Sequence, residues 1–237
     1  MVKKNIVFPS IITLIIILLF FLISCTPQVK TGISSQPSEK AVLPSLHPEI
    51  SALLNKNKDI SNYNYLYDAD KTEGYAVYRV GNKLKKVYTE PLKMGSNLFL
   101  NSFYLDLEKK TVFGVCDKLG VTCTEQWNKA YPLDFFSQEI ADSPRDLAQR
   151  VPATARIAGG ENVESRATEI IEYINADGKL ERLSLDKFYG LPLKQVIYSS
   201  ADTKGTIVVK HTYTHLAVGQ LKESDVALPE GIKIISQ

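Results

Sequence analysis

The chain has 237 residues, and its 28 Lys and Arg against 26 Asp and Glu give a formal net charge of +2. Removal of the first 24 residues would take away Lys3 and Lys4 and no acid, which leaves the rest of the chain neutral. A neutral chain lacks the basic field that favours nucleic acid, so its composition argues against a nucleic-acid partner. The remaining length is enough for one domain with a sizeable core.

The N-terminus has the layout of an export signal that ends in a lipid-modified cysteine. Lys3 and Lys4 precede an apolar stretch over residues 6–23, and the run Leu22-Ile23-Ser24-Cys25 closes it. A basic start, an apolar core and a small residue before a cysteine predict that Cys25 is acylated and that residues 1–24 are removed. The alternative is an uncleaved anchor, because the stretch exceeds the ~7–15 residues of a signal core and reaches the ~17–25 of a spanning helix.

Both interpretations predict the same location for the rest of the chain. Lys3 and Lys4 favour the cytoplasmic side, so the domain is expected on the outer face of the cytoplasmic membrane or in the cell envelope. The membrane is then a partner through the N-terminal anchor. A single acyl chain binds a membrane only marginally, so stable anchoring needs more than one chain on Cys25 or the retained helix.

The sequence after Cys25 predicts a tether followed by one domain. Residues 25–46 are rich in Pro, Ser, Lys and Gln and lack periodicity, which is typical of a flexible tether. Residues 47–237 are expected to form the domain. A short helix is predicted at residues 47–54, with Pro48 in its first turn.

From about residue 62 the sequence changes to short β-type runs separated by turn signals. The twelve tyrosines and many Val, Ile and Thr residues favour β structure. Residues 75–80 and 83–88 flank Gly81-Asn82, a two-residue hairpin signal, and a second hairpin joins residues 167–174 to residues 180–185. Further strands are expected at residues 98–107, 111–116, 193–198 and 206–218.

The strand pattern supplies a large apolar face, and helical patterns are scarce. The side chains expected on that face are Tyr75, Val77, Phe99, Phe103, Tyr173, Val196, Tyr198, Ile207, Val209 and Tyr213. A helix is predicted at residues 143–150, with Ser143 as N-cap and Pro144 at its first position. Many antiparallel strands with few helices predict a sandwich or a barrel-like sheet.

Cys116 and Cys123 have six residues between them and use up the remaining cysteines of the chain. In an exported domain this pattern predicts a disulfide. The alternative is a redox site, which usually has two residues between its thiols and a helix N-terminus beside them. The longer spacing here favours the structural disulfide.

His211 and His215 are the candidate metal ligands, and their spacing argues against that role. The sequence around them is strongly β, and residues four apart on a strand share a face but lie ~13 Å apart at ~3.3 Å per residue. One zinc ion with bonds of ~2.0–2.1 Å cannot bridge that separation, so no metal is predicted. Both histidines are expected on the apolar face with Tyr213, or at its rim.

Sequence motifs for catalysis are missing. The chain contains no G-x-S-x-G, no H-E-x-x-H and no glycine-rich phosphate loop, and Gly159-Gly160 is most simply a turn between strands. We therefore expect neither an enzyme nor a cofactor.

Two short strings in the last third carry a resemblance to a known family. Residues 186–196 read DKFYGLPLKQV and residues 226–234 read VALPEGIKI. They resemble the LolA/LolB/RseB-like lipoprotein-carrier fold family, whose members often start a strand with Gly-Leu-Pro and end near Leu-Pro-Glu-Gly. In physical terms, Gly190 allows a turn and Pro192 starts a strand where its missing N–H costs nothing. The resemblance covers about residues 62–234.

The resemblance implies a mainly β (α+β) fold: a half-open antiparallel β-barrel, with a few short helices as a lid over an apolar cavity. It also implies that the cavity holds lipids or lipoprotein acyl chains, or senses them. No functional residue carries over from the family, because the early strands show no family motif. The N-terminal anchor departs from a soluble carrier and favours a tethered acceptor or sensor.

We therefore expect a membrane-anchored, extracytoplasmic protein that binds lipid or acyl chains in an apolar barrel cavity. The helix at residues 143–150 is the candidate lid. The candidate ligand-binding side chains are Phe99, Phe103, Leu105, Ile207, Val209 and Tyr213. The alternative is a surface interaction or envelope-sensor protein whose barrel is filled by its own side chains and takes no lipid.

Overall fold

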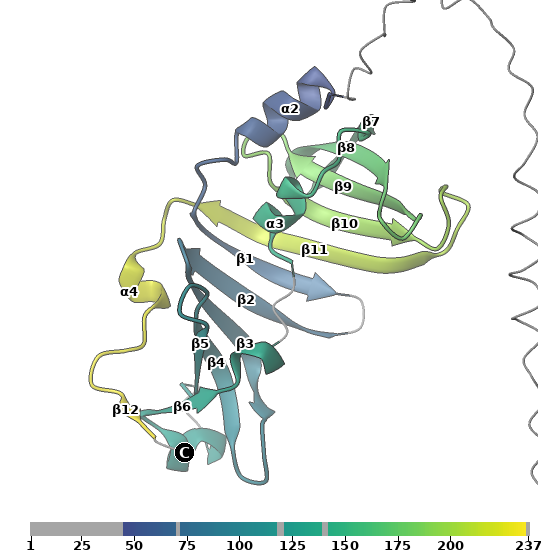
Figure 1. Ribbon diagram of the computed structural model, residues 1–237. Helices are drawn as coiled ribbons and strands as arrows, with labels where there is room; N and C mark the ends of the chain where they lie inside the picture. The colour runs from purple at the N-terminus through teal and green to yellow at the C-terminus, as the bar shows by residue number, and fades with distance from the viewer. Residues whose placement is uncertain (1–44, 70–71, 118–120, 139–141, 236–237) are drawn as a thin grey trace, which may run out of the picture. The chain divides into compact units, whose positions relative to one another are not determined.

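The computed structural model describes residues 45–69, 72–117, 121–138 and 142–235 (Figure 1). The chain divides into two units, Met1–Val42 and Leu43–Gln237, and every described residue belongs to the second. The predicted signal or anchor, Cys25 and nearly all of the predicted tether lie outside the described residues and stay predictions. Within the described ranges, no helix has the length and apolar character needed to cross a membrane.

The described domain consists mainly of strands. Its helices are α2 (Pro48–Asn55), α3 (Pro144–Gln149) and α4 (Glu223–Val226), with 3-10 turns η1 (Val121–Gln126) and η2 (Phe135–Ser137). Its strands are β1 (Asn62–Ala69), β2 (Thr72–Val80), β3 (Lys83–Lys93), β4 (Phe99–Asp106), β5 (Thr111–Val115), β6 (Lys129–Leu133), β7 (Arg156–Val163), β8 (Arg166–Ile174), β9 (Leu180–Asp186), β10 (Pro192–Tyr198), β11 (Ile207–Val218) and β12 (Lys233–Ile234).

All these strands form one sheet in the order β12-β6-β5-β4-β3-β2-β1-β11-β10-β9-β8-β7. Every neighbouring pair is antiparallel except β12 and β6, which run parallel. The sheet is open, because β7 and β12 are its two edges (Figure 1). The predicted fold class, mainly β with one open antiparallel sheet and a few short helices, is confirmed.

Local sequence signals explain the elements that were predicted. The β2–β3 hairpin turns at Gly81, which has a φ of 58°, and β8 and β9 pair as expected. Helix α3 begins with a capping box, in which the Ser143 hydroxyl accepts from the Asp146 N–H and the Asp146 carboxylate accepts from the Ser143 N–H. Each half of the box satisfies a backbone donor that the first turn leaves unpaired.

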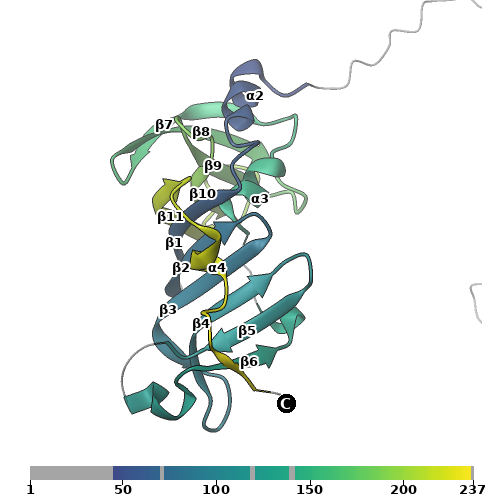
Figure 2. The same ribbon diagram turned by 90° about the vertical axis from the view of Figure 1, so that its left-hand side faces the viewer.

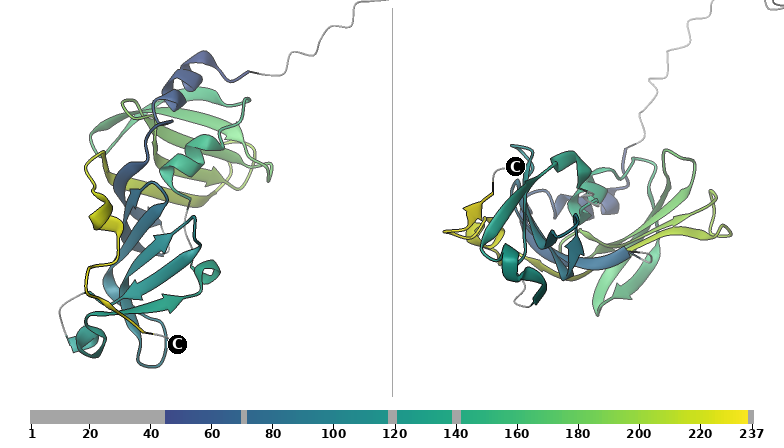
Figure 3. Two further views of the ribbon diagram at one scale, coloured as in Figure 1. Left: turned by 60° about the vertical axis from the view of Figure 1, so that its left-hand side comes forward. Right: turned by 90° about the horizontal axis from the view of Figure 1, so that it is seen from below.

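The main core lies on one face of the sheet, which we call the inner face. Helices α2 and α3 lie on this concave side and contribute Ile50, Leu53 and Leu147 to the core (Figure 3). On the outer face, Tyr104 and Val115 form a smaller cluster against Leu228 and Ile232. These two residues belong to the C-terminal segment, which runs from α4 past β3, β4 and β5 to β12 (Figure 2). The short helices α2 and α3 therefore cover the inner face.

Candidate functional site

A row of aromatic rings crosses the inner face over five neighbouring strands. Tyr213 of β11 pairs with Tyr67 of β1, Tyr67 pairs with Tyr75 of β2, and Tyr75 pairs with Tyr88 of β3. Their ring centroids lie 5.7, 4.8 and 5.2 Å apart, and the Tyr88 ring lies 5.8 Å from Phe103 of β4. We call these five residues the aromatic ladder.

The ladder follows from strand geometry. Neighbouring strands lie about 4.8 Å apart, so opposed or diagonal side chains on one face bring their rings within contact distance, and Tyr88 and Phe103 are the diagonal pair. Each aromatic pair contributes roughly 0.5–1.5 kcal/mol beyond burial, so the row stiffens the middle of the sheet. Lys86 of β3 lies over the Tyr75 and Tyr88 rings at 3.9 and 4.8 Å and adds a positive charge to this surface.

Most of the ladder is buried. Tyr213 is 0% exposed, Phe103 2%, Tyr67 6% and Tyr75 9%, while Tyr88 is half-buried. The interior is therefore largely filled by the protein's own side chains. A ligand can reach these rings only if part of the cover moves.

Helix α3 is the part of the cover that the contacts describe best. The Tyr213 hydroxyl donates to the Asp142 carbonyl at 3.1 Å, and Arg79 donates to the Ser143 hydroxyl at 3.3 Å. Burial raises the pKa of Tyr213 well above its ordinary value, and neighbouring Tyr67 and Asp142 act in the same direction, so this phenol stays a donor. On its apolar side α3 buries Pro144, Leu147 and Ala148. Polar contacts and a small apolar surface thus hold α3 in place.

A pocket of about 530 Å³ opens beside the end of α3, over the inner face of β8, β9 and β10. Its lining includes Glu181 and Tyr173, which are 7% and 8% exposed, and Arg150 at the C-terminal end of α3. We call it the α3 pocket. Arg150 forms an ion pair of 2.5 Å with Asp142, another lining residue, and both side chains are about half exposed.

The Glu181 carboxylate is the centre of a hydrogen-bond network in the α3 pocket. Gln195 donates to it at 2.8 Å, Asn175 donates at 3.4 Å, and the Tyr173 hydroxyl is a further partner. Burial raises the pKa of Tyr173 well above its ordinary value, and the Glu181 charge raises it further. The hydrogen-bond partners of this buried carboxylate are therefore neutral groups, and Arg150 interacts with it electrostatically.

The α3 pocket and the aromatic ladder meet at His211. Its Nδ1 lies 3.1 Å from Oε1 of Gln195, and its ring contacts Tyr67 edge-on with centroids 5.3 Å apart. Since Gln195 donates through Nε2 to Glu181, its Oε1 is left to accept from His211. The polar pocket and the aromatic row thus form one continuous stretch of the inner face.

The structure separates the sequence-predicted ligand residues into two groups. Phe103 and Leu105 are buried on β4, and Tyr213 is buried on β11 with half-buried Val209. Strands β3, β2 and β1 lie between the two groups. Phe99 is half-buried at the start of β4, and Ile207 is 52% exposed at the start of β11.

Sequence reasoning missed Tyr67 and Tyr88, the residues that join these two groups through Tyr75. The alternating run Tyr63, Tyr65, Tyr67 was the available signal for an aromatic strand face. This run does not indicate which strand pairs with the strand that contains it.

The expectation that His211 and His215 share a face is wrong. His215 has a φ of 54°, and the register between β1 and β11 shifts there, so Leu216 takes the buried position. His215 is exposed, with its Nδ1 3.2 Å from Oε1 of Glu164. In the part of the chain that the structure describes, no three His, Cys, Asp or Glu side chains gather as metal ligands would.

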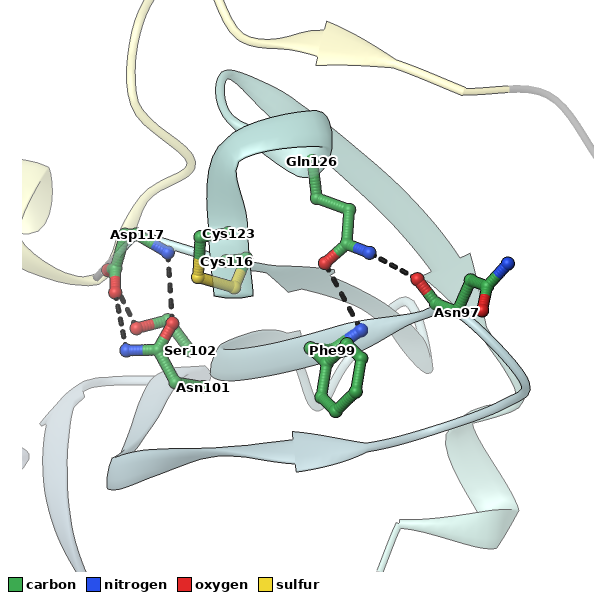
Figure 4. The surroundings of a disulfide bond; sticks show 8 residues. All are labelled: Asn97, Phe99, Asn101, Ser102, Cys116, Asp117, Cys123 and Gln126. Carbon is green, nitrogen blue, oxygen red and sulfur yellow. Dashed lines mark hydrogen bonds between the residues drawn. A yellow bond between two sulfur atoms is a disulfide. The ribbon is translucent and has the colours of Figure 1, made fainter. Parts of the chain in front are cut away.

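Cys116 and Cys123 form the predicted disulfide, which ties the end of β5 to η1 (Figure 4). Both cysteines are buried. On one side, Asp117 accepts hydrogen bonds from Asn101 and Ser102 of β4 at 2.6 and 2.7 Å. On the other side, Gln126 accepts from the Phe99 N–H at 3.1 Å and donates to the Asn97 carbonyl. The disulfide is therefore embedded in contacts with β4, as expected of a structural bond.

Solved structures with a similar fold are known. MucB is 15% identical with a TM-score of 0.47, over 80% of this chain and 66% of MucB. LprF from Mycobacterium bovis is 13% identical with a TM-score of 0.44, over 79% and 99%. The LolA superfamily protein NE2245 from Nitrosomonas europaea is 12% identical with a TM-score of 0.28, over 76% and 97%. These similarities concern the fold alone. No family profile and no curated protein matches the chain.

Proposed function

We propose that this protein is a membrane-anchored, extracytoplasmic module that binds lipid acyl chains against the aromatic ladder when α3 moves away. The observation that carries the proposal is the ladder itself, a row of five aromatic side chains on one sheet face. A short helix with polar attachments lies beside it. The function requires no catalytic group and no cofactor.

The energies involved support such an opening. Exposing Pro144, Leu147 and Ala148 costs about 4 kcal/mol, and losing the hydrogen bonds from Tyr213 and Arg79 costs about 2 kcal/mol more. Each methylene that enters an apolar site gains about 0.8 kcal/mol. About seven or eight methylenes would offset the opening, and a membrane acyl chain has roughly twice that number. The remaining methylenes would provide the affinity.

The proposed anchor fits this role. Acylated Cys25 and the tether at residues 25–46 would hold the domain within reach of a membrane surface. A tethered protein meets its ligand at a high effective concentration, so it requires only moderate affinity. A lipid acceptor or a lipid sensor works under these conditions.

A second candidate function is favoured by the burial of the ladder. Tyr213 and Phe103 are almost completely covered, as expected of an interaction or envelope-sensor protein whose interior is filled. Such a protein would use its surface and take up no lipid. The two functions differ in whether the interior admits an acyl chain.

The test is uptake of a fluorescent fatty acid by the delipidated protein, after native mass spectrometry for co-purified lipid. Val209 and Val208 provide a matched pair on β11, because Val209 is half-buried on the inner face and Val208 is 45% exposed on the other. We expect Val209→Asp to lower the affinity at least tenfold and Val208→Asp to leave it within about twofold. A delipidated wild-type protein that takes up no probe would support the second candidate instead.

A further inference from the structure

The α3 pocket has the size and the polarity of a ligand site, which the aromatic ladder lacks. Its volume of about 530 Å³ lies within the range of roughly 300–1,000 Å³ that small-molecule sites occupy. Its lining combines apolar side chains with a few converging polar groups, among them Glu181, Tyr173 and Gln195. This mixture is typical of a site that orients a polar group.

The charges of the α3 pocket favour a cation. Three carboxylates line it, those of Asp142, Asp177 and Glu181, against the single guanidinium of Arg150. Arg150 pairs with Asp142 and also interacts electrostatically with Glu181. The lining as a whole keeps a formal charge of −2, and a cleft concentrates such a field.

The side chains also indicate which kind of cation would fit. Glu181 and Asp177 carry carboxylate oxygens, which accept hydrogen bonds and suit a group with N–H donors. Quaternary ammonium groups lack N–H donors and are recognised by cages of several aromatic rings, whereas Tyr173 is the aromatic residue in this lining. The pocket therefore suits a primary ammonium better than a choline group.

We propose that the α3 pocket binds the primary ammonium group of a zwitterionic phospholipid headgroup of the phosphoethanolamine type. The inference rests on the proposed function, because His211 joins the pocket to the aromatic ladder that would hold the acyl chains. Glu181 and Asp177 bind the ammonium. The exposed part of the Arg150 guanidinium, which keeps donors beyond its pair with Asp142, faces the phosphate.

The experiment uses the full chain in a non-ionic detergent and titrates it with headgroups that carry no acyl chain. Glycerophosphoethanolamine should bind at least tenfold more tightly than glycerophosphocholine or glycerophosphoglycerol. Glu181→Gln should weaken its binding at least tenfold and Asp177→Asn about threefold. Asp177 is an exposed turn residue, so Asp177→Asn tests the site even if Glu181→Gln disturbs the fold. Glu230→Gln, an exposed change in the C-terminal segment, is the control and should have no effect.

A second measurement separates a lipid from a free amine. Vesicles of phosphatidylethanolamine should deliver lipid to the protein at least fivefold faster than vesicles of phosphatidylglycerol, and Asp177→Asn should reduce that preference. Equal binding of the three free headgroups would overturn the inference, even if the fluorescent fatty acid still binds and the proposed function stands. If glycerophosphoethanolamine binds but the protein shows no preference between the two kinds of vesicle, the ligand of the pocket is a free amine and not a membrane phospholipid. If the free headgroup binds but no acyl probe does, the proposed function fails while the ammonium site remains.

Discussion

The Tyr213 hydroxyl donates a hydrogen bond of 3.1 Å to the backbone carbonyl of Asp142, one residue before the N-cap of α3. The Tyr213 ring is one end of the aromatic ladder, so this bond ties the proposed lid to the surface that it would uncover. Loss of the bond should therefore ease opening and leave the ladder intact.

Tyr213→Phe tests this connection. The variant keeps the ring and removes the hydroxyl, so opening of α3 should cost about 1 kcal/mol less. We expect the affinity for a fluorescent fatty acid to rise about fivefold. Tyr198→Phe is the control, since Tyr198 lies on β10 near Arg182, on the outer face. Unchanged affinity in Tyr213→Phe would indicate that α3 does not open for the ligand.

Cys25→Ser tests the proposed anchor. If Cys25 carries the lipid, the variant should be released from the membrane or accumulate as a longer precursor. Membrane fractionation with mass measurement of the product distinguishes these outcomes. A variant that stays in the membrane at the wild-type size would favour an uncleaved N-terminal helix. Cys116→Ser is the matched control, because it removes a cysteine without changing the run Leu22-Ile23-Ser24-Cys25.

Cys123→Ser tests the stabilising role of the disulfide. The bond closes a small loop, so its loss should lower the free energy of unfolding by roughly 2–3 kcal/mol. Urea unfolding of the variant and the wild type measures the difference. Thiol labelling of the unfolded, unreduced wild-type protein should find neither Cys116 nor Cys123 reactive. Complete labelling of both would contradict the bond and weaken the proposed location outside the cytoplasm.

The elements predicted from the sequence are those that local signals determine. Gly81-Asn82 sets the β2–β3 hairpin by itself, and Ser143 with Pro144 starts α3. Gly159 and Gly160 were expected in a turn, but both lie within β7, where pairing with β8 accommodates a register shift. The partner strand decided their conformation, and that strand is not visible from the local sequence.

The candidate site depended on pairings that no local signal reveals. Tyr67 lies beside Tyr213 because β1 pairs with β11, far away in the chain. The bulge that turns His215 away from the inner face also arises in that pairing. The α3 pocket combines the end of α3 with three later strands, and periodicity within a single segment cannot predict such a combination.

Acid should weaken the outer face of the sheet through Glu172. Burial alone would raise the pKa of Glu172, but hydrogen bonds from Arg182 and Arg156 outweigh burial and hold the pKa below its ordinary value of 4.5. A carboxylate whose pKa is lower in the folded state stabilises the fold fully at a pH above its pKa in the unfolded state. That contribution is lost as the pH falls through its pKa in the folded state. We therefore expect the urea midpoint to decrease as the pH falls below about 4.5.

The control for this pH dependence is Glu172→Gln, which removes the titrating group and keeps its shape. Its urea midpoint should change less between pH 6 and pH 3 than that of the wild type. Some dependence should remain, because Glu161 also has a lowered pKa: burial opposes the shift, and hydrogen bonds from Ser184 and Lys194 outweigh burial. Parallel curves for variant and wild type would contradict the role of Glu172.

Gly190, in the turn between β9 and β10, should tolerate no side chain. It has a φ of 69°, and a Cβ there would lie 2.1 Å from the carbonyl oxygen of Leu53 in α2. Its own carbonyl accepts a hydrogen bond of 2.8 Å from Asn57, just beyond α2. Gly190→Ala must therefore strain the turn and also push α2 away from the sheet.

Gly178 provides the comparison, because it has a φ of 73° and open space where a Cβ would be. Gly178→Ala should lower the free energy of unfolding by about 1–2 kcal/mol, the cost of a left-handed conformation for an L-residue. Gly190→Ala includes that cost and the displacement of α2, so we expect a loss of more than about 3 kcal/mol. Urea unfolding measures both variants, and hydrogen exchange of the α2 amides reports the displacement. Equal losses, with α2 equally protected in both variants, would show that the turn tolerates a side chain and that α2 is not held against it.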